Sequence, residues 1–236
     1  MVAFGAGFYS FLRGDTGTPV SAAPPSATRA TSAPRATIVP IVLGDSLARG
    51  TGDETGLGIG GRLVEELRRR HVPVKNAVNL AVNGAKTRDL EQELTGHSVR
   101  VLLGESNVII VSIGGNDLWG EANTRNSPPP DPERTSNAVL ERVTSIVRSV
   151  RAANPSARVF VIGLYNPFVT TPFGRALTPL VNRWNASLME RFATDRDVVI
   201  VQTSDIFAFR DRLSFDRFHP GDEGYELIAR RIADAL

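Results

Sequence analysis

From residue 38 onward, short apolar runs alternate with longer segments of helical spacing. The apolar runs, rich in β-branched residues, cover 38–43, 75–80, 107–113, 158–163 and 197–202. Helix-like spacing covers 62–70, 86–103, 133–153 and 177–193, and a last helix is expected after His219-Pro220, where the proline suits a first turn. Apolar strands that alternate with helices form parallel sheets covered on both faces. The order predicts an α/β fold, a three-layer α/β/α sandwich with a central parallel sheet of about five strands.

Composition separates the chain into a short N-terminal segment and one domain. With 236 residues, 42% of them hydrophobic, the chain can bury one substantial core, which we assign to residues 37–236. Residues 1–36 differ in composition from the rest of the chain. An apolar and aromatic stretch at 2–12 is far shorter than the ~20 residues that span a bilayer, and no basic residue precedes it. Residues 16–36 are rich in Pro, Ala, Ser and Thr, the composition of a linker.

The N-terminal segment gives an indication of where in or outside the cell the protein is found. Its pattern favours the remnant of a membrane anchor or export signal followed by a stalk. We therefore expect an exported or cell-surface protein with an N-terminal membrane tether. A disordered tail on a cytoplasmic protein is the alternative. The sequence does not indicate an oligomeric state.

Charge and residue content exclude several classes of function. The formal net charge is only +2, too balanced to indicate a nucleic-acid partner. No cysteine is present, which excludes disulfides and thiolate metal sites. The three histidines, His71, His97 and His219, are too far apart in the sequence to suggest a zinc site. We expect neither a metal ion nor another cofactor.

Polar residues follow two of the expected strands. Gly44-Asp45-Ser46 comes directly after the first strand, and Gly114-Gly115-Asn116-Asp117 comes after the third. Ligands of open parallel sheets bind beyond the carboxyl ends of the strands. A tight turn at such an end can present a serine nucleophile. Asp216 and His219, three residues apart near the other end of the chain, supply a carboxylate and an imidazole.

Together these motifs resemble the GDSL or SGNH hydrolase family. Its four signature blocks occur here in order: Gly44-Asp45-Ser46-Leu47; Asn79-Leu80-Ala81-Val82-Asn83-Gly84; Gly114-Gly115-Asn116-Asp117; and Asp216-Arg217-Phe218-His219-Pro220, followed by Gly224-Tyr225. Each block alone is a weak signal, but four in the right order make the resemblance specific. It implies the flavodoxin-like SGNH hydrolase fold for residues 37–236.

Carried over position by position, the resemblance implies a serine hydrolase mechanism. Ser46 would be the nucleophile, His219 the general base and Asp216 the carboxylate that orients it. The oxyanion hole would comprise the backbone N–H groups of Ser46 and Gly84 and the side-chain amide of Asn116. A serine hydroxyl needs a neighbouring base to take its proton, and N–H donors stabilise the charge that develops on the carbonyl oxygen.

Each motif alone also has a simpler interpretation. Gly44-Asp45-Ser46 fits an Asp/Ser turn that caps the next helix. Asp216 and His219 fit a solvated pair that caps the last helix. Gly84 can satisfy turn geometry, and Asn116 can be a left-handed turn residue. Because these interpretations would require four coincidences, the catalytic one is favoured.

Three rival classes can be tested on the sequence. Gly56-Leu57-Gly58-Ile59-Gly60-Gly61 satisfies G-x-G-x-x-G, the fingerprint of a dinucleotide-binding module. That fingerprint should open the helix directly after the first strand, whereas residues 44–55 intervene here. In an α/β-hydrolase elbow, G-x-S-x-G, a glycine would stand where this chain has Ala48. A non-catalytic binding module on this fold would be expected to have lost one of the site residues, and none is lost.

The sequence indicates the type of reaction more precisely than it indicates the substrate. Loops 118–136 and 164–175 are expected to roof the pocket and to set specificity. Their aromatic residues would either line an apolar acyl site or pack beneath the loops: Trp119, Tyr165, Phe168 and Phe173. The resemblance is closest to lysophospholipase-like, arylesterase-like and thioesterase-like members, which implies a small-molecule substrate, a short- to medium-chain acyl ester. Carbohydrate or cell-wall O-acetyl esterase activity is the alternative.

Overall fold

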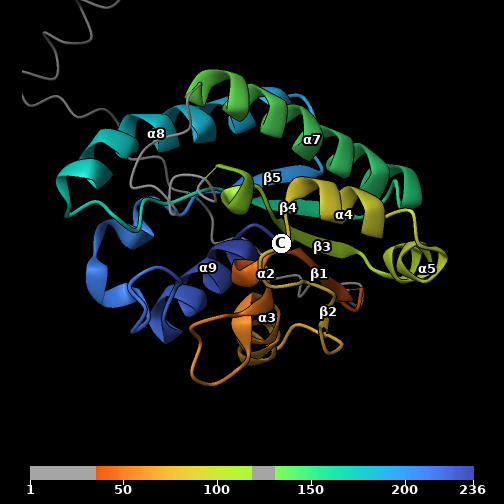
Figure 1. The fold of residues 1–236 in the computed structure, drawn as a ribbon. Helices are drawn as coiled ribbons and strands as arrows, with labels where there is room; N and C mark the ends of the chain where they lie inside the picture. The colour runs from red at the N-terminus through yellow and green to blue at the C-terminus, as the bar shows by residue number, and fades with distance from the viewer. Residues whose placement is uncertain (1–35, 119–130) are drawn as a thin grey trace, which may run out of the picture. The chain divides into compact units, whose positions relative to one another are not determined.

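The structure is a computed structural model that describes residues 36–118 and 131–236 (Figure 1). Residues 1–35 of the predicted N-terminal segment lie outside the described residues, as do Trp119 and most of the 118–136 loop. None of the helices in the part that the structure describes is both long enough and apolar enough to cross a bilayer.

Five parallel strands form the centre of the domain. They are β1 (Pro40–Gly44), β2 (Val78–Asn79), β3 (Val108–Ser112), β4 (Arg158–Ile162) and β5 (Val198–Val201). Their order in the sheet is β2-β1-β3-β4-β5, and every neighbouring pair is parallel. All carboxyl ends therefore lie at one edge. The order is that of a flavodoxin-like sheet, whose ligand site lies at the switch between β1 and β3.

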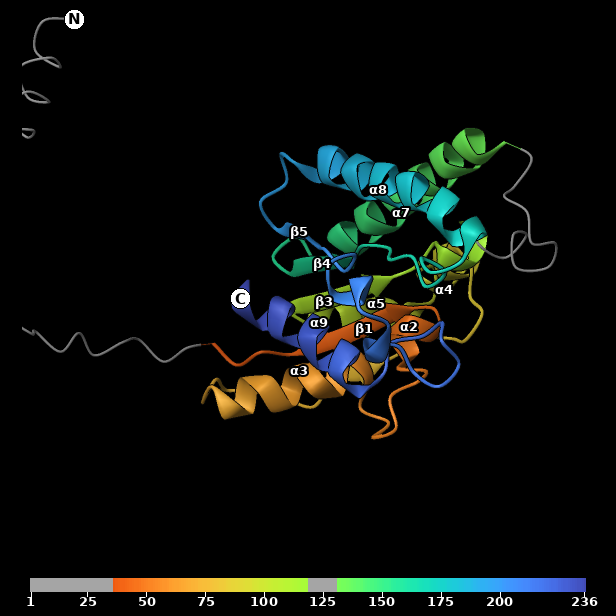
Figure 2. The same cartoon turned by 90° about the vertical axis from the view of Figure 1, so that its left-hand side faces the viewer.

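Helices cover both faces of the sheet (Figures 1 and 2). One face carries α4 (Thr87–Glu93), α5 (His97–Glu105), α7 (Pro132–Ala153) and α8 (Pro172–Phe192), and the other carries α3 (Gly58–Arg69) and α9 (Asp222–Asp234). Successive strand residues alternate between the two cores: Ile41 packs with the first group, and Val42 with the second. The three-layer sandwich predicted from the sequence is confirmed.

Some short helical elements were not predicted from the sequence. The four-residue helix α2 (Ser46–Arg49) and the 3₁₀ turns η1 (Ile206–Ala208) and η2 (Arg210–Arg212) are too short to show a periodic pattern. The predicted helix at 86–103 is in fact two helices, α4 and α5. The break lies at Gly96, whose backbone is extended (φ −65°, ψ 132°) and which caps α5.

The last helix begins after His219-Pro220 as expected, but Pro220 does not lie in its first turn. Helix α9 begins at Asp222, and Gly221 is its N-cap. The preceding residues are held by antiparallel contacts instead: Ser214 N–H donates to the carbonyl of His219, and Gly221 N–H donates to the carbonyl of Arg212, both at 2.8 Å. Pro220 belongs to this turn, which also carries His219.

Candidate active site

Ser46 stands directly beyond the carboxyl end of β1, as the first residue of α2. Gly44 ends the strand with φ +130°, and a Cβ there would lie 1.8 Å from the carbonyl oxygen of Ser112 in β3. Only glycine therefore fits at this close approach. Asp45 is the N-cap of α2, since its Oδ1 accepts the N–H of Leu47 at 3.1 Å. The helix-capping interpretation is thus right for Asp45, and the cap places Ser46 at the exposed edge of the sheet.

Ser46, His219 and Asp216 form a continuous chain of hydrogen bonds. Nε2 of His219 lies 2.8 Å from Oγ of Ser46. Nδ1 of the same ring lies 2.6 Å from Oδ2 of Asp216. A hydroxyl, an imidazole and a carboxylate in this order are the arrangement of a nucleophile, its base and the group that orients the base.

Asp216 is held as a carboxylate by its neighbours. Its Oδ1 accepts the hydroxyl of Ser214 at 2.6 Å and the N–H groups of Phe218 and His219, both at 2.9 Å. Burial raises the pKa of Asp216, but the hydrogen bonds from Ser214, from the His219 ring and from the two backbone N–H groups outweigh burial and lower that pKa below its usual range. Arg217, with φ +57°, provides the left-handed turn between the two side chains.

Tyr165 and Phe168 support the loop that carries His219. The buried Tyr165 hydroxyl donates to the carbonyl of Phe218 at 2.6 Å, and its ring packs on Phe207 with 4.1 Å between centroids. Phe218 in turn packs against Phe168 and stands edge-on to the His219 imidazole, 4.9 Å between centroids. Tyr165 thus supports the loop that carries His219 from below, and Phe168 packs against Phe218 of the same loop. Trp119 and the side chain of Phe173 lie outside the described residues.

The three expected oxyanion donors lie in the segments that follow β1, β2 and β3. Gly84 has φ +79°, and no atom lies within 4 Å of the position its Cβ would take, so conformation rather than crowding favours glycine. One N–H of the Asn116 amide donates at 2.9 Å to the carbonyl of Ala85, the residue that follows the second block, and the other N–H of that amide remains for the substrate. Ser46 N–H, in the first turn of α2, has no intrahelical acceptor.

A small cavity of about 50 Å³ joins these groups. Ser46, Asn116 and His219 line it together with Leu164 and Tyr165, which follow β4. Asp216 does not line the cavity but is hydrogen-bonded to His219, which does. Four of the five site residues predicted from the sequence are therefore brought together here. Gly84 lies one residue from the Ala85 carbonyl that Asn116 binds.

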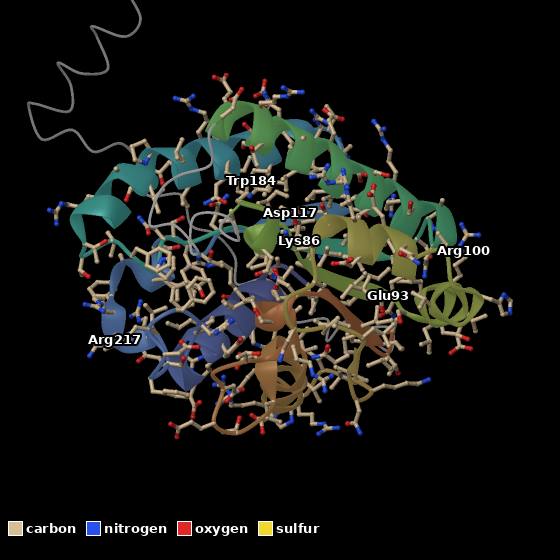
Figure 3. The ribbon with its side chains drawn as sticks, in the orientation of Figure 1. Lys86, Glu93, Arg100, Asp117, Trp184 and Arg217 are labelled. Carbon is tan, nitrogen blue, oxygen red and sulfur yellow. The ribbon has the colours of Figure 1, made fainter. Side chains whose placement is uncertain are left out.

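Asp117 is a site residue to which the sequence assigned no role. Its carboxylate accepts the N–H of Thr87 at 2.9 Å and the hydroxyl of Thr87 at 2.7 Å, and Arg142 of α7 donates to the same hydroxyl at 2.7 Å. Arg142 also lies 3.5 Å from the carboxylate. Figure 3 labels Asp117 beside Lys86, the residue before α4. No sequence spacing connects these three residues, because the contacts depend on the order of the strands.

Asp45 is buried beside the nucleophile. The Ser112 hydroxyl donates to Oδ1 of Asp45 at 3.4 Å. Burial raises the pKa of Asp45 to about 7, although hydrogen bonds from the backbone at Leu47 and Ala48 and from Ser112 act in the opposite direction.

The glycine-rich segment does not form a dinucleotide site. It opens α3, which α2 separates from β1. The first N–H of α3, on Gly58, already donates to the Asp53 carboxylate at 2.7 Å, and Arg62 pairs with that carboxylate at 2.8 Å. An internal carboxylate thus occupies the place where a phosphate would bind.

Comparisons with known proteins agree with this geometry. The model of the GDSL-like Lipase/Acylhydrolase family matches residues 42–227. The uncharacterized protein YpmR of Bacillus subtilis (strain 168) is 29% identical over 207 residues, which cover 84% of this chain and 81% of that protein. The solved structure of the lipase Lip_vut3 from a goat rumen metagenome has a TM-score of 0.73 at 21% identity and covers 84% of this chain and 97% of that one. The acetyl xylan esterase AlAXEase has a TM-score of 0.61 at 15% identity, over 84% of this chain and 100% of that one.

Proposed function

The chain belongs to the GDSL-like Lipase/Acylhydrolase family and is a carboxylic ester hydrolase, and from this premise we propose that it is a serine esterase that hydrolyses short- to medium-chain acyl esters through an acyl-enzyme. The observation that carries the proposal is the hydrogen-bonded row of Ser46, His219 and Asp216, with contacts of 2.8 and 2.6 Å. Both distances are within the reach that proton transfer and orientation require.

In the proposed reaction, His219 Nε2 takes the Ser46 proton while Oγ attacks the ester carbonyl carbon. The negative charge on the carbonyl oxygen is stabilised by the N–H groups of Ser46 and Gly84 and by the Asn116 amide. His219 then gives the proton to the leaving alcohol, and the acyl group remains on Ser46. A water molecule, deprotonated by His219, releases the acid and restores the serine. Asp216 orients the imidazole and stabilises its protonated form.

The proposal is tested by labelling with a fluorophosphonate, which reacts with activated serines. We expect one adduct, on Ser46, by intact mass and peptide mapping. Ser46→Ala should remove both the adduct and turnover while leaving the melting temperature unchanged. Ser98→Ala, at an exposed position in α5, is the matched control and should label and turn over normally. An adduct on another serine, or full activity of Ser46→Ala, would contradict the assignment.

O-acetyl esterase activity on a carbohydrate or cell-wall polymer is the second candidate. The cavity of about 50 Å³ at Ser46 favours it, because a space of this size suits an acetyl group. A panel of nitrophenyl esters of increasing chain length, run beside an acetylated sugar, separates the two. Higher kcat/KM on the acetylated sugar than on every nitrophenyl ester would favour the second candidate.

A further inference from the structure

Asn79 ends β2 and opens the second signature block, yet the proposed reaction gives it no role. Its side-chain amide contacts two segments of the candidate active site. Nδ2 donates to the carbonyl of Ala48 in α2 at 3.0 Å and lies 3.5 Å from the carbonyl of Arg49. Oδ1 accepts the N–H of Ala81 at 3.0 Å. Because only the nitrogen of an amide can donate to a carbonyl, the side chain fits in one orientation.

The Nδ2 contact completes the short helix that carries Ser46. A helix leaves its last four carbonyls without intrahelical partners, and α2 has only four residues. The N–H of Gly50 donates to the carbonyls of Ser46 and Leu47, both at 3.2 Å. Asn79 supplies a donor for the next carbonyl, that of Ala48. The side chain therefore holds the C-terminal end of α2 against the end of β2.

The Oδ1 contact lies at the start of the segment that carries Gly84. Directly beyond it, the N–H of Val82 donates at 2.9 Å to the carbonyl of Gly44, two residues before the nucleophile. The carbonyl of Val82 accepts the N–H of Ala85 at 3.1 Å, which closes a four-residue turn. Gly84 is the third residue of this turn and has φ +79°. The direction of the Gly84 N–H therefore depends on where Asn79 lets the turn begin.

We propose that Asn79 is a positioning residue that holds α2 and the oxyanion loop, residues 80–85, in a fixed relation to each other. This inference rests on the proposed esterase function. Asn79 does not line the cavity at Ser46, so it acts through the backbone N–H groups of Ser46 and Gly84, which belong to the two segments that it joins. A misplacement of about 1 Å between catalytic groups can cost roughly 10²-fold in rate.

The test is Asn79→Ala, assayed on a soluble nitrophenyl ester and normalised by complete labelling with a fluorophosphonate, which counts the active serines. We expect kcat per labelled site to fall by roughly 10- to 100-fold with little change in KM, because the oxyanion donors act mainly in the transition state. Asn79→Asp keeps an oxygen for the Ala81 N–H but has no donor for the Ala48 carbonyl. It should lose about as much activity as Asn79→Ala.

Asn107→Ala is the matched control. The Asn107 side chain also joins two segments, since Oδ1 accepts the N–H of Val39 at 2.8 Å and Nδ2 donates to the carbonyl of Thr37 at 2.9 Å. These contacts lie before β1 and β3, at the edge of the sheet opposite to Ser46. Asn107→Ala should therefore lower the melting temperature about as much as Asn79→Ala does and leave kcat unchanged.

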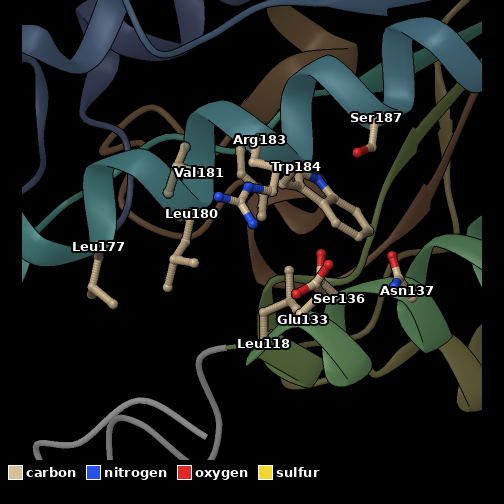
Figure 4. Close-up of a pocket in the computed structure, with 11 residues that line it drawn as sticks. Leu118, Glu133, Ser136, Asn137, Leu177, Leu180, Val181, Arg183, Trp184 and Ser187 are labelled. Atoms are coloured by element: carbon tan, nitrogen blue, oxygen red, sulfur yellow. The ribbon is translucent and has the colours of Figure 1, made fainter. Parts of the chain in front are cut away.

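A second control removes an asparagine at a position remote from the nucleophile. Asn137 of α7 is exposed and lines a cavity of about 200 Å³ between α7 and α8, beside Trp184 (Figure 4). Among the described residues, this cavity shares only Leu164 with the cavity at Ser46. Asn137→Ala should keep kcat, KM and the melting temperature.

The outcomes separate the positioning role from the esterase function. A wild-type kcat in Asn79→Ala, a change confined to KM, or fewer labelled sites with a normal kcat per site would overturn the positioning role and leave the esterase function in place. A wild-type kcat in Asn79→Asp would overturn it too, and this variant decides the outcome if Asn79→Ala yields no folded protein. If the wild-type protein hydrolyses no ester and Ser46 takes no adduct, the esterase function itself fails, and this inference fails with it. A fall in kcat per site that Asn107→Ala does not share supports the positioning role.

Discussion

At the scale of single residues, Asn116 separates transition-state stabilisation from substrate binding. Its remaining amide N–H is needed when charge develops on the carbonyl oxygen, and less when the ester first binds. We expect Asn116→Ala to lower kcat by roughly 10²- to 10³-fold with little change in KM. Steady-state kinetics on a soluble ester measure both constants, with Asn76→Ala, at an exposed position, as the control. A change confined to KM would place Asn116 in substrate binding instead.

Asp45 predicts a pH dependence of stability. Its pKa is raised from 3.8 to about 7 in the folded protein, so between these values the folded state keeps a proton that the unfolded chain has released. The free energy of unfolding therefore falls as pH rises from about 4 to about 7. Asp45→Asn cannot titrate and should lessen this fall between pH 5 and pH 8 by on the order of 2 kcal/mol.

Urea unfolding of both proteins at the two pH values measures the difference. The side-chain amide introduced by Asp45→Asn retains an oxygen that can accept the Leu47 N–H, so the cap of α2 is preserved in the variant. Parallel pH dependences in the wild type and in Asp45→Asn would show that Asp45 is not the titrating group.

At the scale of elements, Asp117 holds the start of α4 against the loop after β3. Its bonds to Thr87, at 2.9 and 2.7 Å, join two of the loops that supply oxyanion donors. We expect Asp117→Asn to lower kcat by roughly 10- to 100-fold, with KM much less affected, because small displacements of catalytic groups are costly. If Asp117 acts by positioning Asn116, adding Asp117→Asn to Asn116→Ala should cause little further loss. Fully multiplicative losses would show that the two residues act independently.

The sequence predicts elements well where they are long and apolar, and poorly where local contacts decide. The runs that became β1, β3 and β4 are unmistakable because both faces of those strands are buried. Helix α8 begins at Pro172, five residues before the expected 177, because the Thr171 hydroxyl accepts the N–H of Gly174 at 2.9 Å and caps it. The residues with expected catalytic roles were found through the family motifs. The contacts of Asp117 and the cavity beside Trp184 were not, because both join segments that only the three-dimensional order of strands and helices brings together.

At the scale of the whole molecule, Thr37 is among the first residues that the structure describes, and it already contacts the domain. Its carbonyl accepts the Asn107 side chain at 2.9 Å, and Ile38 pairs with Val74. We expect deletion of residues 1–36 to leave kcat/KM on a soluble ester and the melting temperature nearly unchanged. Deletion of residues 1–40 removes Ile38 and the first residue of β1 and should lower the melting temperature. A large loss of activity in the shorter deletion would show that the N-terminal segment docks on the domain.

Ser46 and His219 touch although 173 residues separate them in the chain. During synthesis the serine leaves the ribosome long before its base exists. At about 5–20 residues per second, this interval lasts roughly 10 to 35 seconds. The carboxylate and the imidazole arrive together, in the last turn before the final helix. A nascent chain therefore has no serine–histidine pair until residue 219 has been synthesised and has reached Ser46.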